Sequence, residues 1–242
     1  MQPGETAQEA DTANAATFSA FEDKAIRLGF IRKVYGILSV QLLVTFSFVI
    51  VPSVSDVVKD FVKANHWMII TAAVLGFATL ITLACCEYHR TFPINLICLG
   101  IFTLTQSFLL MNVGAYINKP EVLMWAVIIT FVICLALTVF AFQTKFDFTI
   151  FNGILFVFLV VLVVMGIILL IVGRNRIFHL IYASLGAFIF SAYLVIDTQM
   201  IVGGSHKYQY SPEDYIFAAI NLYLDIINLF LMILRILQFS KS

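Results

Sequence analysis

The sequence predicts an all-α integral membrane protein with seven transmembrane helices. Composition is the first observation behind this prediction: 62% of the 242 residues are hydrophobic, 12% are charged, and the mean hydropathy is +1.01. These values lie well outside the range of ordinary soluble domains. The second observation is that the apolar residues gather in uninterrupted stretches of about 20 residues, the length that spans a bilayer. The connections between them are short, so no separate soluble domain is expected.

The segment before the first apolar stretch has a different composition. Residues 1–30 are mostly polar and small and lack helical periodicity, which predicts a disordered tail. The first span, residues 34–51, begins too far from the N-terminus to be a cleaved signal peptide. Four basic residues precede this span: Lys24, Arg27, Arg32 and Lys33. Because positive charge beside the first helix usually stays in the cytosol, we expect a cytosolic N-terminus.

Residues 31–242 form the predicted seven-helix transmembrane domain. Its spans are expected at residues 34–51, 67–86, 92–113, 122–142, 148–172, 177–201 and 215–237. After the first span, "SVSDVVKDFVKANH" (residues 53–66) places valines and Phe61 at helical spacing, which predicts an amphipathic helix on the membrane surface. The loop charges do not decide whether the last segment crosses fully or enters and leaves on one side.

Asp197 and Asp225 are the only acidic residues well inside expected spans. A charged side chain at the centre of a bilayer costs about 2.5–3.5 kcal/mol on insertion scales, so both are candidates for a functional site. Asn221, Asp225 and Asn228 repeat at i, i+4 and i+7, which places them in one polar stripe that faces the bundle. Thr198 adjoins Asp197.

The last two spans are joined by a short turn, "GGSHKYQYSPED". If these helices are antiparallel neighbours, Asp197 and Asp225 lie at similar depth in the cytosolic half of the membrane. Two carboxyl groups that are close together in a region of low dielectric share one proton, which makes a pH-sensitive pair. The alternative is that each aspartate is a protonated or hydrogen-bonded link between helices.

Four stretches resemble the transmembrane BAX-inhibitor motif family and, within it, the Lifeguard branch that includes the Golgi anti-apoptotic proteins. They are "GFIRKVYGILSVQLLVT", "INLICLGIFTLTQS", "DTQMI" and "SPEDYIFAAINLYLDIINLFLMILRIL". The resemblance runs from Phe30 to the C-terminus. It implies seven helices with the last one central, located in endoplasmic reticulum or Golgi membranes. It also implies a pH-sensitive calcium leak that lowers the content of the store and dampens cell death.

The resemblance assigns roles to individual residues. The family's paired aspartates match Asp197 and Asp225. An arginine that latches the first aspartate in bacterial members corresponds to Arg90 in "CCEYHRTF", and Glu213 matches the acid of a Ser-Pro-Glu motif. The family's usual tyrosine before the first aspartate is Ile196 here. A helix start explains "SPED" equally well, because serine, proline and acids favour the first turn.

We therefore predict that Asp197 and Asp225 form a proton-sharing gate and a transient Ca²⁺ site. A held proton pins the two helices together and shuts the path. Its loss leaves two repelling charges whose oxygens bind Ca²⁺, aided by Asn221 and Asn228. Ca²⁺ is the permeant ion and H⁺ the regulator; no bound cofactor, enzymatic activity or nucleic acid partner is expected.

Two other functions stay open at the level of sequence. A pair of membrane carboxylates also suits an intramembrane aspartyl hydrolase, although no Gly-x-Gly-Asp motif surrounds Asp225. The chain could instead be a membrane scaffold that binds cell-death regulatory proteins, with the polar tail as the binding segment. Membrane lipid surrounds the protein in all three cases.

Overall fold

The computed structural model describes residues 3–85, 90–117, 119–172, 175–204 and 206–240. Seven of its helices are long and apolar enough to cross a membrane, and the described residues contain no strand. The prediction of an all-α multi-pass membrane protein is confirmed. The last segment is a single helix of full crossing length.

The helices follow the expected order, with small shifts at their ends. They are α1 Pro3–Val54, α2 Asp56–Ala64, α3 Trp67–Cys85, α4 Ile94–Ala115, α5 Pro120–Gln143, α6 Asn152–Val172, α7 Arg176–Val202 and α8 Tyr215–Ser240. Short 3₁₀ turns, η2 Phe148–Phe151 and η3 Pro212–Asp214, precede α6 and α8. Ser55 begins α2 by accepting a hydrogen bond from the backbone N–H of Val58, and Asn175 begins α7 in the same way through Ile177.

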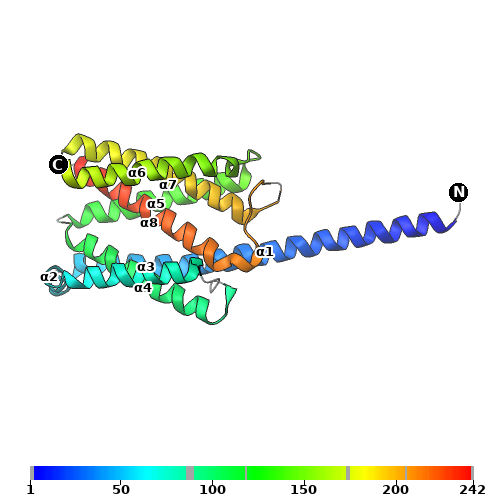
Figure 1. Ribbon diagram of the computed structural model, residues 1–242, viewed down its shortest axis with the longest axis horizontal. Coiled ribbons are helices and arrows are strands. Elements are labelled where there is room, and N and C mark those ends of the chain that lie inside the picture. Colours follow the sequence, from blue (N-terminus) through cyan, green and yellow to red (C-terminus); the bar gives the residue numbers. More distant parts are fainter. Residues whose placement is uncertain (1–2, 86–89, 118, 173–174, 205, 241–242) are drawn as a thin grey trace.

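The N-terminal segment differs from the expected tail, because the backbone of α1 is helical from Pro3. Its first part extends far beyond the bundle (Figure 1). Alanine, glutamate and glutamine are common here, and these are good helix formers even without an apolar stripe. Residues 1–2 lie outside the described residues.

The short helix α2 was expected from its amphipathic spacing and is present. Val62 is buried against Met111 and Ala115 of α4, while Val57 is 80% exposed. One apolar edge of α2 therefore packs on the bundle and the other is left for the surrounding membrane interface.

Two groups of helices enclose α8. Figure 1 shows α8 running between α1, α3 and α4 on one side and α5, α6 and α7 on the other. α8 contacts α1, α4, α5 and α7. In its most apolar stretch 72% of the residues are buried, against 11–39% in the other six spans. A polar side chain on α8 therefore faces protein rather than lipid.

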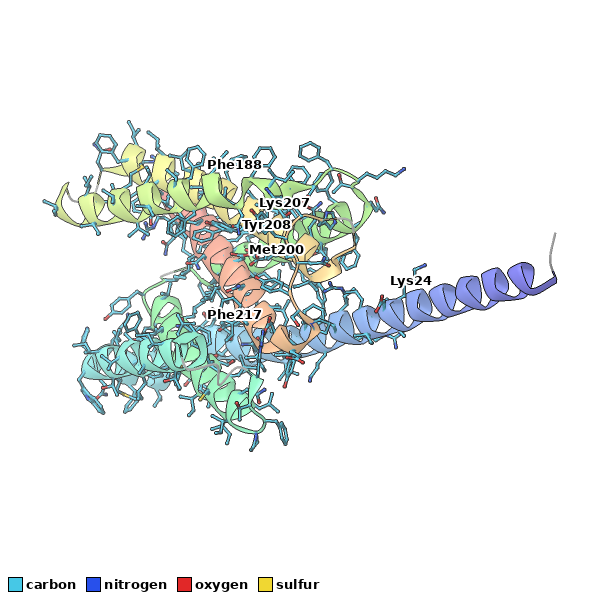
Figure 2. All side chains as sticks on the ribbon, turned by 45° about the vertical axis from the view of Figure 1, so that its right-hand side comes forward. Lys24, Phe188, Met200, Lys207, Tyr208 and Phe217 are labelled. Carbon is cyan, nitrogen blue, oxygen red and sulfur yellow. The ribbon has the colours of Figure 1, made fainter. Side chains whose placement is uncertain are left out.

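The connection between α7 and α8, residues 203–204 and 206–211, folds back over the end of α7. Gly203 and Gly204 have φ angles of 67° and 81°, which allow the chain to reverse. The backbone N–H of Tyr210 then donates to the carbonyl of Met200, 3.0 Å away. In Figure 2 the labels Met200, Lys207 and Tyr208 mark this reversal.

Candidate functional site

Asp197 and Asp225 meet between α7 and α8, near the end of the bundle that carries the α7–α8 connection. Asp197 precedes the end of α7 by about one and a half turns, and Asp225 follows the start of α8 by about three. Each residue is only 8% exposed. Their carboxyl groups lie within hydrogen-bonding reach of each other. The structure thus brings together the two acids that the sequence singled out, at similar depth.

A cavity of about 540 Å³ opens beside the two carboxyl groups. Side chains of α6, α7, α8 and the α7–α8 connection form its walls. The lining residues are Asn152, Leu159, Val163, Phe190, Tyr193, Asp197, Met200, Tyr210, Phe217, Asn221, Leu224, Asp225 and Asn228. Its polar groups therefore gather around the aspartate pair within a largely apolar wall.

Tyr210 of the α7–α8 connection forms part of the cavity wall beside Asp197 and Asn221. Its hydroxyl donates to Oδ1 of Asp197 over a long 3.3 Å and accepts a hydrogen bond of 2.7 Å from Nδ2 of Asn221. Burial, together with the charge of Asp197, raises the pKa of Tyr210 above its usual range. The phenol is therefore a neutral donor to the carboxyl group.

One oxygen of the pair has no donor. Oδ2 of Asp225 is buried and makes no hydrogen bond to any donor among the residues that the structure describes. A buried acceptor of this kind is costly unless a proton, a water or a cation satisfies it. Asn228 does not satisfy it, because its Nδ2 donates to the carbonyl of Leu224 in its own helix.

Of the four supporting residues expected from the sequence, two line the cavity and two do not. Asn221 and Asn228 both line the cavity. Thr198 is fully buried but is not part of the cavity wall. Glu213 lies in η3 with its side chain 74% exposed, away from the aspartates. Ser211 precedes η3 as expected, but its side chain makes no capping hydrogen bond.

The structure does not bring Arg90 to Asp197. Its guanidinium binds both carboxylate oxygens of Asp214, at 2.7 and 3.1 Å, and lies 3.9 Å from Glu213. Arg90 stands just before α4, at the membrane edge, where the acids at the start of α8 are its nearest partners. The expected latch therefore corresponds here to an ion pair between the α3–α4 connection and η3.

Toward the opposite end of the bundle, α6, α7 and α8 pack closely through apolar residues. A Cβ atom added to Gly186 of α7 would lie 2.6 Å from Sδ of Met232 in α8 and 3.4 Å from Leu162 of α6. Leu162 is 3% exposed and Met232 is 8% exposed. These apolar contacts separate the aspartate pair from that end.

Sequence reasoning missed Tyr210 as a member of the site. It lies in the turn between the last two spans and was not singled out there, yet only 8% of it is exposed. The one local signal is the pair "GG" at the start of the turn, which permits the reversal that returns Tyr210 to α7.

The arrangement suits proton exchange and transient binding of a hard cation. A hydrogen bond between two carboxyl groups requires a proton on one of them, because two carboxylates offer only acceptors. Without the proton, four oxygens face one another beside the cavity. Within the described part of the chain, no group of three or more His, Cys, Asp or Glu residues could hold a metal ion. Because Ca²⁺ takes 6–8 oxygen ligands, a cation here would keep part of its water shell.

Known proteins resemble the whole bundle. A family model described as "Inhibitor of apoptosis-promoting Bax1" matches residues 27–242. Protein lifeguard 3 of Mus musculus is 37% identical over 98% of this chain and 78% of its own length. The Homo sapiens protein of that name is 38% identical, over 90% and 70% respectively. The Golgi anti-apoptotic protein of Vaccinia virus (strain Lister) is 35% identical over 96% and 94%.

Proposed function

Because this chain belongs to the family of inhibitors of apoptosis-promoting Bax1, we propose that it inhibits apoptosis as a pH-sensitive calcium leak gated by Asp197 and Asp225. The resemblance first noticed in four sequence stretches is confirmed by matches that cover most of the chain. The relatives are named as lifeguard and Golgi anti-apoptotic proteins, which supports a multi-pass protein of Golgi or endoplasmic reticulum membranes.

One observation carries the proposal: two buried carboxyl groups share a cavity among transmembrane helices. Acidic residues within a membrane are costly, and they commonly mark ion or proton pathways. Among the described residues, no basic side chain lies against either carboxyl group; Arg90 pairs with Asp214 instead. The negative charge of the pair is therefore left for a proton or a permeating cation to neutralise.

The gate follows from the chemistry of the pair. With one proton between them, Asp197 and Asp225 form a link that holds α7 against α8 and closes the path. When that proton leaves, two negative charges repel each other in a region of low dielectric. The helices separate, and the freed oxygens bind Ca²⁺ in transit. Lowering the Ca²⁺ content of the store is the step that protects the cell.

Purified protein in liposomes tests the proposal. Ca²⁺ flux is recorded between about pH 5 and 8 for the wild type, Asp197→Asn and Asp225→Asn. We expect flux in the wild type to rise with pH, and each substitution to abolish this dependence because one member of the pair no longer ionises. Asp60→Asn is the matched control, since it removes an exposed carboxylate from α2 outside the spans.

The outcomes distinguish the calcium leak from the two alternative functions, a membrane scaffold and an aspartyl hydrolase. Flux that keeps its pH profile in Asp225→Asn contradicts the gate. No flux at any pH in protein that remains folded favours the membrane scaffold, with the aspartates as links between helices. Cleavage of a helical reporter peptide that depends on both aspartates favours the aspartyl hydrolase.

A further inference from the structure

Tyr210 belongs to a connection between helices, yet its ring sits inside the bundle. It is 8% exposed and packs edge-on against Phe217, with 6.3 Å between the ring centroids. Its backbone N–H is bonded to Met200 and its hydroxyl to Asp197 and Asn221. The ring therefore lies in the cavity wall beside the aspartate pair, on the side of the α7–α8 connection.

A cationic side chain from α1 binds the connection at the residue that carries this ring and at the side chain of the residue before it. Nη1 of Arg27 donates to the carbonyl of Tyr210 at 2.9 Å, and Nη2 donates to Oε1 of Gln209 at 2.7 Å. Nη1 also lies 3.5 Å from the carbonyl of Ile201, near the end of α7. One guanidinium thus ties α1 to the last turn of α7 and to the residues that position Tyr210. Hydrogen bonds that involve a charged group are the stronger class.

Gly203 provides a second, independent observation: the absence of a side chain at this position leaves room for the guanidinium of Arg27. A Cβ atom at Gly203 would overlap the guanidinium of Arg27, with 2.6 Å to Cζ and 2.7 Å to Nε. Its φ of 67° also lies in the left-handed region, which favours glycine. At the neighbouring Gly204, by contrast, an added Cβ meets nothing within 4 Å. The three atoms nearest to a Cβ at Gly203 all belong to the guanidinium of Arg27.

We propose that Tyr210 is a stopper for the aspartate cavity and that Arg27 is the clamp that keeps it in place. Release of the guanidinium frees the side chain of Gln209 and the backbone carbonyl of Tyr210, and the ring then moves away from the cavity. The carboxyl groups are then open to water and ions from the end that carries the α7–α8 connection. The stopper is distinct from the proton-sharing pair, because it controls access rather than charge.

The contact also links the projecting part of the protein to the site. Arg27 follows directly on the stretch of α1 that leaves the bundle, marked by Lys24 in Figure 2. A force or a partner that moves this stretch therefore acts on the clamp without touching the aspartates. This step rests on the proposed function, since access matters only if the cavity conducts or exchanges protons.

The test measures access to the carboxyl groups directly. Protein in liposomes is treated with dicyclohexylcarbodiimide, which modifies membrane carboxyl groups, and the labelling rates of Asp197 and Asp225 are followed by mass spectrometry. Amide hydrogen exchange of residues 206–211 is measured in the same samples. In Arg27→Gln we expect both rates to rise about tenfold, because charge-assisted hydrogen bonds to the connection are lost.

Two variants complete the clamp experiment. Lys24→Gln is the matched control, because it removes the same charge one turn earlier on α1 and should leave both rates at the wild-type level. Gln209→Ala removes one of the oxygens that bind the guanidinium and should give an intermediate increase. Wild-type labelling and exchange in Arg27→Gln, in protein with an unchanged elution profile, overturn the clamp.

Two substitutions of Tyr210 test whether its ring acts as the stopper. Tyr210→Ala should raise labelling even with Arg27 intact, whereas Tyr210→Phe retains the ring and should label at most twofold faster than wild type. Labelling of Tyr210→Phe as fast as that of Tyr210→Ala would overturn a steric stopper.

Ca²⁺ flux recorded in parallel separates the two proposals. Faster labelling without any flux would contradict the calcium leak but would be consistent with the stopper. Flux in the wild type with unchanged labelling in Arg27→Gln and Tyr210→Ala removes the stopper alone.

Discussion

The hydroxyl of Tyr223 in α8 lies 2.8 Å from the hydroxyl of Thr45 in α1. The Thr45 hydroxyl is also 2.9 Å from that of Ser107 in α4, and all three residues are fully buried. A buried chain of hydroxyl groups therefore joins the last helix to the first group of helices. It fixes the depth of α8 on the side away from the aspartate cavity.

Removing the Tyr223 hydroxyl should destabilise the bundle without closing or opening the cavity. We expect Tyr223→Phe to lower the free energy of unfolding by about 1 kcal/mol, the usual contribution of one interhelical hydrogen bond. Thermal unfolding in detergent measures this, with Tyr116→Phe as the control because its hydroxyl bonds to the exposed His66. Equal stability of both variants would contradict a structural role for the chain of hydroxyl groups.

The spans of this fold were predictable because length and apolarity alone determine them. The expected span 177–201 is Arg176–Val202 in the structure, a difference of one residue at each end, whereas the expected span 148–172 begins as a helix only at Asn152, after the 3₁₀ turn η2. Helicity in residues 3–30 was not predictable from periodicity, since that segment has no apolar stripe to reveal it.

The aspartate pair was predictable for a different reason: a carboxyl group inside a membrane is too costly to be incidental. Tyr210 and Arg27 gave no such signal, because each is an ordinary residue until the connection folds back. The partner of Arg90 was also hidden, since Asp214 lies in η3, which follows the α7–α8 connection, and not in a predicted span. Contacts that depend on the path of a loop therefore require the structure.

Asp147 should stabilise the connection between α5 and α6 at neutral pH but not in strong acid. Burial raises the pKa of its carboxyl group. Hydrogen bonds from Thr149 and from the backbone N–H of Lys207, together with the electrostatic interaction with His206, lower it by more, so that the pKa lies below its ordinary value. A carboxyl group whose pKa is lowered by folding contributes stability above its unfolded pKa, and this is lost as pH falls through the folded pKa.

The matching experiment compares thermal unfolding of wild type and Asp147→Asn. We expect the variant to unfold at lower temperature near pH 7. The difference should begin to shrink as the pH falls below about 4, the ordinary pKa of aspartate, and should disappear once the pH passes below the lowered pKa of the folded carboxyl group. Asp60→Asn controls for the loss of a carboxylate without these donors, because Asp60 is exposed on α2. A constant gap between wild type and Asp147→Asn at all pH values would refute the assignment.

We expect Arg90 to stabilise the contact between the α3–α4 connection and η3, and not to influence the pH dependence of the flux. Because its described ion pairs are with Asp214 and Glu213, Arg90→Gln should leave the midpoint of the flux–pH profile at the wild-type value. The loss of a half-exposed ion pair should cost at most about 1 kcal/mol of stability. Flux across a pH series measures the first effect, and a shifted midpoint would restore Arg90 as a latch on the aspartates.

Gly203→Ala should loosen the α7–α8 connection for two separable reasons. Alanine at φ 67° is strained by about 1–2 kcal/mol, and its Cβ would displace the guanidinium of Arg27. Gly204→Ala imposes a positive φ of 81° but meets no neighbour, so it reports strain alone. We expect Gly203→Ala to lower the unfolding temperature and to raise amide exchange of residues 206–211 more than Gly204→Ala does.

A double-mutant cycle isolates the part that belongs to Arg27. In the Arg27→Ala background the guanidinium is absent, so the excess effect of Gly203→Ala over Gly204→Ala should shrink toward zero. An excess that persists without the guanidinium would mean that Gly203 is required for its backbone angles only. The contact with Arg27 would then be a consequence of the turn rather than the reason for the glycine.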